Sequence, residues 1–162
     1  FRGMIDKYTW VDKGSSYLMS DINAAVLLAQ LEHSNTIQQR RQSAFEFYMN
    51  ELAGWASEIG AVLPHHLNDS TRPFHLFPVL MPDLTSRTNL ISHAKTEGVG
   101  LTFHYVPLHL SPAGEKFGRH NGDFSFTKTV SDTLVRLPLF SGMESRDSYR
   151  VMEILLEFDQ VS

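Results

Sequence analysis

The chain has 162 residues, 42% of them hydrophobic, and a net charge of −4, a composition typical of one ordinary globular domain. The acidic balance disfavours nucleic acid or an anionic membrane as the main partner. Because there is no cysteine, disulfides and thiolate metal sites are excluded, and no apolar run approaches the length of a membrane span. The sequence opens at Phe1 without a Met or a signal pattern, which favours a piece of a longer protein.

The N-terminal third predicts an irregular segment followed by two helices. Residues 1–19 show no clear period. Ser20 precedes an apolar run and can cap a helix, with Asp21 favourable in the first turn. This helix is apolar nearly all round, so we expect it to pack against something beyond its own domain. Ser34 and Asn35 can end it and cap a second helix.

The middle of the chain predicts a loop, a strand and a helix. Gly54 and Gly60 mark the loop. Residues 74–81 indicate a strand, which Pro78 restricts to an edge or a bulge. Asp83 or Thr85 can then cap a helix, which Gly98 would end.

The last third mixes short elements. Residues 101–106 alternate as a short strand that Pro107 stops, and residues 113–135 indicate helices broken at two glycines. Residues 136–140 are extended, and Ser145 can cap a last helix whose face includes Tyr149, Met152, Leu155 and Leu156. Since helices and strands follow no regular βαβ rhythm, we predict an α+β fold.

One stretch, "TFHYVPLHLSP", concentrates chemistry at the end of a predicted strand. It contains His104, Tyr105 and His109 between and around two prolines. Imidazole and phenol offer donors, acceptors and flat faces, which suit a ligand with hydroxyls and a ring, and the prolines favour a preformed loop. From the chemistry alone, a surface turn or core packing is the commoner explanation, and a ligand site is the alternative.

Other site chemistries find less support. None of the eight histidines has a neighbour at a known metal-ligand spacing, so we predict no metal. There is no G-x-S-x-G turn, no Walker loop and no G-x-G-x-x-G motif. Residues 14–16, "GSS", precede a helix start and suit either an anion or simple helix capping.

Three ordered segments, "GSSYLMSDINAAVLLAQLE", "HYVPLHLSPAGEKFG" and "LVRLPLFSGM", make the chain resemble the C-terminal part of the DegT/StrS family of sugar-nucleotide aminotransferases. The resemblance covers nearly the whole chain. It implies the small C-terminal domain of a fold type I pyridoxal-phosphate (PLP) transferase, a short antiparallel sheet packed with helices, within an enzyme that is α/β as a whole. Residues 1–53 would be the connecting segment and interface helices, and residues 54–162 the small domain, with the large PLP-binding domain absent.

The resemblance also implies a reaction. An amino group would move from L-glutamate to a dTDP-linked 4-keto-6-deoxy sugar, in cell-surface polysaccharide or antigen biosynthesis, in a cytoplasmic homodimer without nucleic acid, membrane or metal. None of the five lysines lies in a stretch that resembles the family's Schiff-base segment, so we expect no catalytic residue here and an inactive chain on its own. The alternative is a noncatalytic module for sugar-nucleotide binding or dimerisation.

Only some of the family's site residues have matching residues in this sequence. In the family a G-x-N-Y-R-M segment reaches the cofactor phosphate of the neighbouring subunit; here Gly14, Tyr17 and Met19 match. Ser16 stands at the Asn position and can still donate to the phosphate, whereas Leu18 replaces the bidentate Arg. The resemblance implies these substrate-binding candidates: His104, Tyr105, His109, Lys7 and Tyr8, with Trp10 near the nucleotide.

Overall fold

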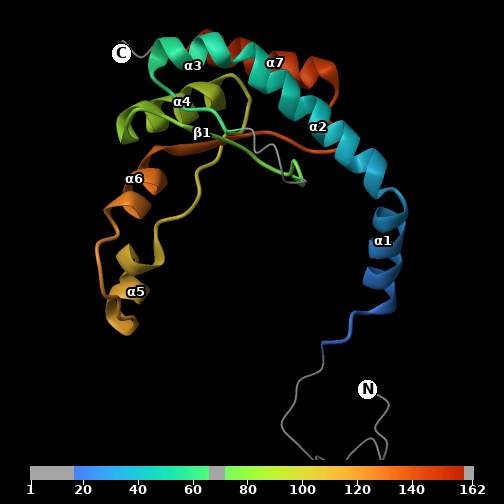
Figure 1. Cartoon of the computed structure of the whole chain (residues 1–162), viewed down its shortest axis with the longest axis horizontal. Helices are drawn as coiled ribbons and strands as arrows, with labels where there is room; N and C mark the ends of the chain where they lie inside the picture. Colours follow the sequence, from blue (N-terminus) through green and yellow to red (C-terminus); the bar gives the residue numbers. More distant parts are fainter. Residues whose placement is uncertain (1–16, 66–71, 159–162) are drawn as a thin grey trace, which may run out of the picture. The chain divides into compact units, whose positions relative to one another are not determined.

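The computed structural model describes residues 17–65 and 72–158 (Figure 1). By its contacts the chain divides into two units, residues 1–37 and residues 38–162. The division falls inside a helix, and the functional boundary expected after residue 53 stays a prediction. Four candidates from the N-terminal segment, Lys7, Tyr8, Trp10 and Ser16, lie outside the described residues.

The first unit contributes one capped helix and the start of a second. Helix α1 spans Asp21–Glu32, and the Ser20 side chain accepts a hydrogen bond from the backbone N–H of Asn23 at 3.3 Å, which confirms the predicted cap. Helix α2, Ser34–Glu51, follows after a single residue, so Ser34 begins a helix and Asn35 caps nothing.

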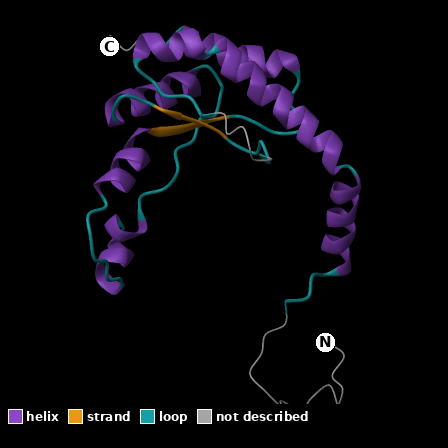
Figure 2. Cartoon of the chain, viewed as in Figure 1, coloured by secondary structure: helices purple, strands orange, loops and turns teal. Residues whose placement is uncertain are grey.

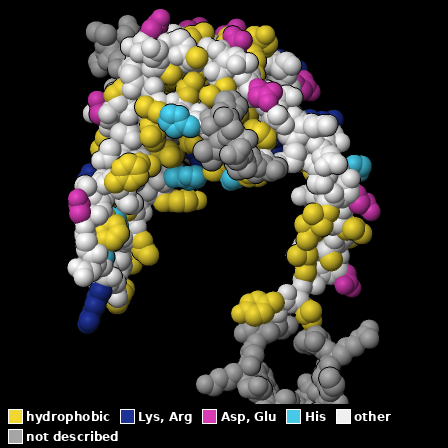
Figure 3. All heavy atoms as spheres, in the orientation of Figure 1, with side chains coloured by type: hydrophobic (Ala, Val, Ile, Leu, Met, Phe, Trp, Pro, Cys, Tyr) yellow, Lys and Arg dark blue, Asp and Glu magenta, His cyan; other side chains and the backbone are white. Residues whose placement is uncertain are grey.

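No residue of α1 is buried. Its exposed apolar side chains appear along the helix in Figure 3, and they are Ile22, Val26, Leu27, Leu28 and Leu31. The sequence predicted an apolar surface all round this helix, and none of the described residues of its own unit, 17–37, buries that surface.

The second unit contains short helices around a small sheet (Figure 2). After α2 its elements are α3 (Ala53–Ile59), β1 (Phe77–Leu80), α4 (Leu84–Thr96), the 3-10 turn η1 (Leu108–Leu110), α5 (Pro112–Phe117), α6 (Ser125–Thr133), β2 (Leu134–Leu137) and α7 (Ser145–Leu156). Asp83 caps α4 by accepting from the Ser86 N–H at 2.7 Å, and Gly98 follows its end with a φ of 78°, as predicted.

The sheet has two antiparallel strands in the described part of the chain. β1 pairs with β2 so that Phe77 faces Leu137 and Pro78 faces Arg136. Single bridges continue the sheet on both sides, from Val62 to Leu80 and from Thr102 to Arg136. Pro78 therefore lies in a strand with only one full neighbour, which suits a residue without an N–H.

The core lies on one face of this sheet, beneath α2, α3, α4 and α7. Phe77 is fully buried, and its ring meets those of Phe45 and Tyr48 at centroid distances of 4.9 and 5.1 Å. The buried Tyr48 hydroxyl donates to the Pro138 carbonyl at 3.1 Å, and burial raises the pKa of this tyrosine. The expected α+β class, a short antiparallel sheet packed with helices, is what the structure contains.

Several predicted boundaries were wrong. Gly54 lies inside α3, because helix formation continues until Gly60 adopts a φ of 74°. The strand expected at 74–81 shortens to β1, and the one expected at 101–106 keeps only the bridge at Thr102. Both strands are shorter than predicted because β2 has only four residues with which a neighbouring strand can pair.

The last helix also differs in detail from its prediction. Glu144 occupies the cap position, and its N–H donates to the Asp147 carboxylate at 2.9 Å. The buried face comprises Ser148, Val151, Ile154 and Leu155, whereas Tyr149 and Leu156 are exposed. Within the described residues, no helix is long and apolar enough to cross a membrane.

Candidate functional site

His104 and Tyr105 lie where the chain leaves the sheet. Their rings stack at a centroid distance of 5.4 Å and an angle of 22°. Tyr105 has a φ of 26°, in the left-handed region that non-glycine residues rarely occupy, and its carbonyl accepts a hydrogen bond from the Ser131 hydroxyl at 2.8 Å. This turn replaces the predicted strand and leaves the Tyr105 side chain 78% exposed.

His109 lies in a different cluster, with two aromatic neighbours. Its ring centroid is 5.4 Å from that of His120 and 4.6 Å from that of Phe124, and the latter two are 5.3 Å apart. His109 comes from η1, while His120 and Phe124 come from the loop between α5 and α6. The fold therefore joins residues that are eleven or more positions apart in the sequence.

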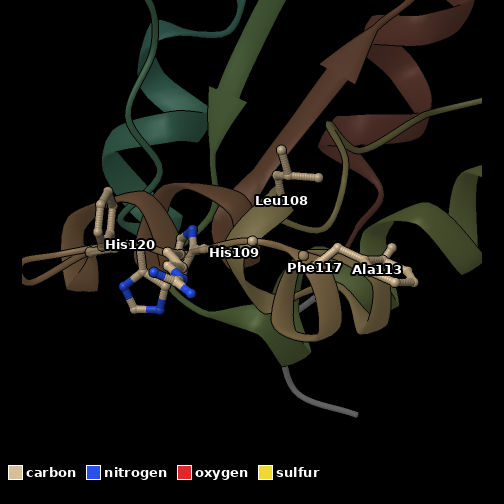
Figure 4. A pocket seen from close by; sticks show the side chains of 9 residues that line it. Leu108, His109, Ala113, Phe117 and His120 are labelled. Atoms are coloured by element: carbon tan, nitrogen blue, oxygen red, sulfur yellow. The ribbon is translucent and has the colours of Figure 1, made fainter.

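A pocket of about 510 Å³ adjoins this cluster. Figure 4 shows His109 and His120 next to each other at one end, with Ala113 and Phe117 at the other. Its complete lining is Leu108, His109, Ala113, Gly114, Phe117, Gly118, Arg119, His120 and Phe124. Apolar walls with two imidazoles and one guanidinium suit a ligand that combines a ring with polar groups.

Gly114 is one of the residues that line that pocket. A Cβ at this position would lie 1.7 Å from the carbonyl oxygen of Leu108, so only glycine fits. Ser111 fastens the same turn, since its hydroxyl donates to the Leu108 carbonyl at 2.7 Å and accepts from the Gly114 N–H at 3.0 Å. The turn from η1 into α5 is thus held by local contacts.

The charge around His104 comes from the neighbouring strand. Partial burial lowers the pKa of His104, and the positive charge of Arg136 lowers it further. Both causes favour the neutral imidazole, which has one donor and one acceptor nitrogen, over the imidazolium. Arg136 itself donates to the Thr102 hydroxyl at 3.2 Å.

Three predicted site residues are thus placed, and they form two groups. His104 stacks on Tyr105, whereas His109 lines the pocket with His120 and Phe124. His120 and Phe124 are not among the residues predicted from the sequence, because the glycines around them indicated only a loop. Their distance from His109 in sequence follows no helical or strand period, so no pattern linked them.

The lysines of the described residues lie at the surface. A Schiff base requires a lysine that is buried against the cofactor, but the described lysines, Lys95, Lys116 and Lys128, are all exposed, and Lys128 pairs with Asp132. The phosphate candidate, Ser16, lies outside the described residues. In the same part of the chain, no three His, Asp or Glu side chains are grouped to hold a metal ion.

Sequence comparison identifies the family. Residues 2–156 match the DegT/DnrJ/EryC1/StrS aminotransferase family, and the chain belongs to it. It is 29% identical, over 96% of its length, to the dTDP-3-amino-3,4,6-trideoxy-alpha-D-glucose transaminase of Streptomyces venezuelae. It is 28% identical, over 86% of its length, to an uncharacterized protein of Methanocaldococcus jannaschii. The chain spans 40% and 36% of these two relatives.

Solved structures agree on the fold. The crystal structure of S. venezuelae DesV in complex with a ketimine intermediate matches with a TM-score of 0.80 and 29% identity, covering 93% of this chain and 39% of that one. Helicobacter pylori PseC, an aminotransferase involved in the biosynthesis of pseudoaminic acid, matches with a TM-score of 0.79 at 17% identity, covering 90% and 39%. The latter likeness concerns the fold alone.

Proposed function

We propose that this chain is the C-terminal, substrate-side part of a PLP-dependent sugar-nucleotide aminotransferase. The enzyme transfers an amino group from L-glutamate to a dTDP-linked 4-keto-6-deoxy sugar in cell-surface polysaccharide or antigen biosynthesis. Within the family, the spacing of the motifs and the "DKYTW" segment at residues 6–10 favour dTDP-4-amino-4,6-dideoxygalactose transaminase as the activity. The observation that carries the proposal is the family match across residues 2–156.

The pocket beside His109 supports a role in sugar binding. A sugar ring presents hydroxyls at its edge and C–H groups on its faces. The imidazoles of His109 and His120 can form hydrogen bonds with the hydroxyls, while Phe117 and Phe124 offer apolar surface to the faces. In this proposal His109 and His120 orient the sugar, and Tyr105, exposed beside His104, donates a hydrogen bond from its hydroxyl to a substrate oxygen.

The cofactor belongs to a part of the enzyme beyond the described residues. The family is generally PLP-dependent, and PLP supplies an electron sink for the amino transfer. Ser16 would donate a hydrogen bond to its phosphate from the partner subunit, while Lys7 and Tyr8 would contact the substrate. No step of the transfer is assigned to a residue between Tyr17 and Phe158.

The exposed surface of α1 supports a homodimer whose interface contains residues 14–32. Leu28 is 58% exposed on a helix without a single buried residue, although most of its side chains are apolar. A two-fold interface repeats each contact, so Leu28→Glu should separate the enzyme into monomers and lower its affinity for PLP. Light scattering of the intact enzyme measures this, with Gln30→Glu as a control on the same helix; a stable, active Leu28→Glu dimer would contradict the interface.

The second candidate is a noncatalytic module for sugar-nucleotide binding or dimerisation. It is favoured by the exposed lysines of the described residues together with the apolar surface of α1. Such a module would bind the nucleotide sugar or form a dimer without any amino transfer.

One experiment separates the two. The intact protein is incubated with PLP, L-glutamate and a dTDP-4-keto-6-deoxy sugar, and the amino sugar is detected by mass spectrometry. In parallel, this chain alone is mixed with PLP and reduced with borohydride, and any adduct is mapped. We expect amino sugar from the intact protein and no stoichiometric lysine adduct on the chain. Binding of the nucleotide sugar without amino transfer favours the module, and labelling of one specific lysine of the chain contradicts the assignment of the cofactor site.

A further inference from the structure

Arg136 lies in the middle of the sheet face that is turned away from the core. In β2 the neighbouring Val135 and Leu137 are buried, so the alternation of a strand directs Arg136 to the opposite face. There it stands between Pro78, its partner in β1, and Thr102, its partner in the isolated bridge. The backbone on both sides therefore holds this arginine in place.

No carboxylate of the described residues pairs with the guanidinium of Arg136. One terminal nitrogen donates to the Thr102 hydroxyl at 3.2 Å, whereas Nε is buried without an acceptor. No ion pair in residues 17–65 and 72–158 involves Arg136. A buried donor on a charged group is costly when it has no acceptor, so a negatively charged oxygen at this place would stabilise the arrangement.

Two further polar groups stand beside it. The Thr102 oxygen accepts from Arg136, so its own proton is available to a ligand. His104 lies two residues beyond Thr102 and is close enough to Arg136 for the arginine charge to disfavour its protonation. Together they give a planar guanidinium fork, a hydroxyl and an imidazole, a donor set suited to a carboxylate or a phosphate.

We propose that Arg136, Thr102 and His104 bind an anionic group of the substrate, either a carboxylate of the amino donor or the diphosphate of the nucleotide sugar. The choice of these two ligands rests on the proposed function, whereas the preference for an anion rests on Arg136. Because His104 stacks on Tyr105, the anion lies next to the loop that we assign to the substrate.

NMR of the histidine side chains in the full chain tests this site. The His104 signal, assigned through His104→Gln, is titrated with acid alone and in the presence of L-glutamate, dTDP or inorganic phosphate. We expect L-glutamate or dTDP to raise the pKa of His104, because an added negative charge favours the imidazolium. In Arg136→Gln the dissociation constant of that probe should rise roughly tenfold to a hundredfold, since a charged hydrogen-bond donor is lost.

Matched variants serve as controls for unfolding and for nonspecific effects of charge. Arg136→Lys keeps the charge without the fork and should bind with intermediate affinity. Arg146→Gln removes an exposed arginine that pairs with Glu144, and it should leave binding unchanged. Unfolding curves of all variants show whether the fold is retained.

Three results would overturn the anion site. They are a His104 signal that neither L-glutamate nor dTDP moves, an Arg136→Gln chain that responds like the parent, and inorganic phosphate that binds as tightly as the better of the two probes. Kinetics of the intact enzyme distinguish a failure of the anion site from a failure of the proposed function. Amino transfer with unchanged KM values in Arg136→Gln rejects the site alone, whereas an Arg136-dependent probe response without any amino transfer rejects the function alone.

Discussion

The packed core and the segment from residue 102 to residue 132 are stabilised by different kinds of contact. Every helix of the core buries at least two residues, as α3 does with Trp55 and Ala56. The 102–132 segment buries none, although it contains several aromatic residues and the pocket of about 510 Å³. Apolar burial thus stabilises the core, whereas local turns and ring contacts order the segment that carries the candidate site.

This difference predicts that stability and function are carried by separate residues. A substitution in the core should lower the free energy of unfolding of the whole unit. A substitution in the 102–132 segment should change ligand binding with little effect on unfolding, because no residue of this segment is buried.

The largest expected effect comes from the core. Phe77→Ala removes a fully buried ring that contacts Phe45 and Tyr48, and it should lower the free energy of unfolding by about 3–5 kcal/mol. Phe126→Ala removes a ring that is 80% exposed on α6, and it should change the free energy of unfolding by less than about 0.5 kcal/mol. Urea unfolding of both variants measures the contrast; equal losses would show that the segment is part of the cooperative core.

The next effect concerns activity in the intact enzyme. Tyr105→Phe and His109→Ala should each lower kcat/KM for the nucleotide sugar roughly tenfold to a hundredfold, corresponding to the loss of one good hydrogen bond of about 1–3 kcal/mol. The absorption spectrum of the bound cofactor should stay as in the parent enzyme, and so should the unfolding midpoint. Unchanged kinetics in both variants would remove these residues from the proposed site.

Two glycines give a matched pair with smaller effects. Gly114→Ala forces a Cβ against the Leu108 carbonyl, so the turn must rearrange and the pocket should lose its shape. Gly54→Ala, in α3, meets nothing within 4 Å and should stabilise the chain by up to about 1 kcal/mol. Saturation transfer NMR with a dTDP-sugar should show weaker binding only for Gly114→Ala. Normal binding by that variant would mean that the pocket is not the sugar site.

The smallest effect is a pH dependence of the core. The backbone N–H of Ser86, followed by its hydroxyl, holds the pKa of the Asp83 carboxyl below its ordinary value. The ionised cap therefore stabilises the fold fully above the unfolded-state pKa of about 4, and this contribution is lost as the pH falls through the lower folded-state value. Relative to Asp83→Asn, the parent chain should lose unfolding free energy below about pH 4. If the unfolding free energies of the parent chain and Asp83→Asn change with pH in the same way down to pH 2, the role of this cap is contradicted.

The sequence by itself determined the elements whose cause is local. Ser20 and Asp83 cap their helices as predicted, and Gly98 follows the end of α4, because a cap depends on a few neighbouring residues. The resemblance of three ordered motifs to the DegT/StrS family also pointed to the family and to the class of fold. The apolar surface of α1 was visible in the sequence, although the dimer inferred from it stays a prediction.

Only the tertiary structure decided which polar groups meet. His109 comes to lie against His120 and Phe124 because the loop between α5 and α6 returns to η1, and no period in the sequence encodes that return. Arg136 meets Thr102 because a bridge joins residues 34 positions apart. Such pairings depend on the register of the sheet and on the packing of the whole unit, whereas a cap or a helix face depends on residues within one or two turns.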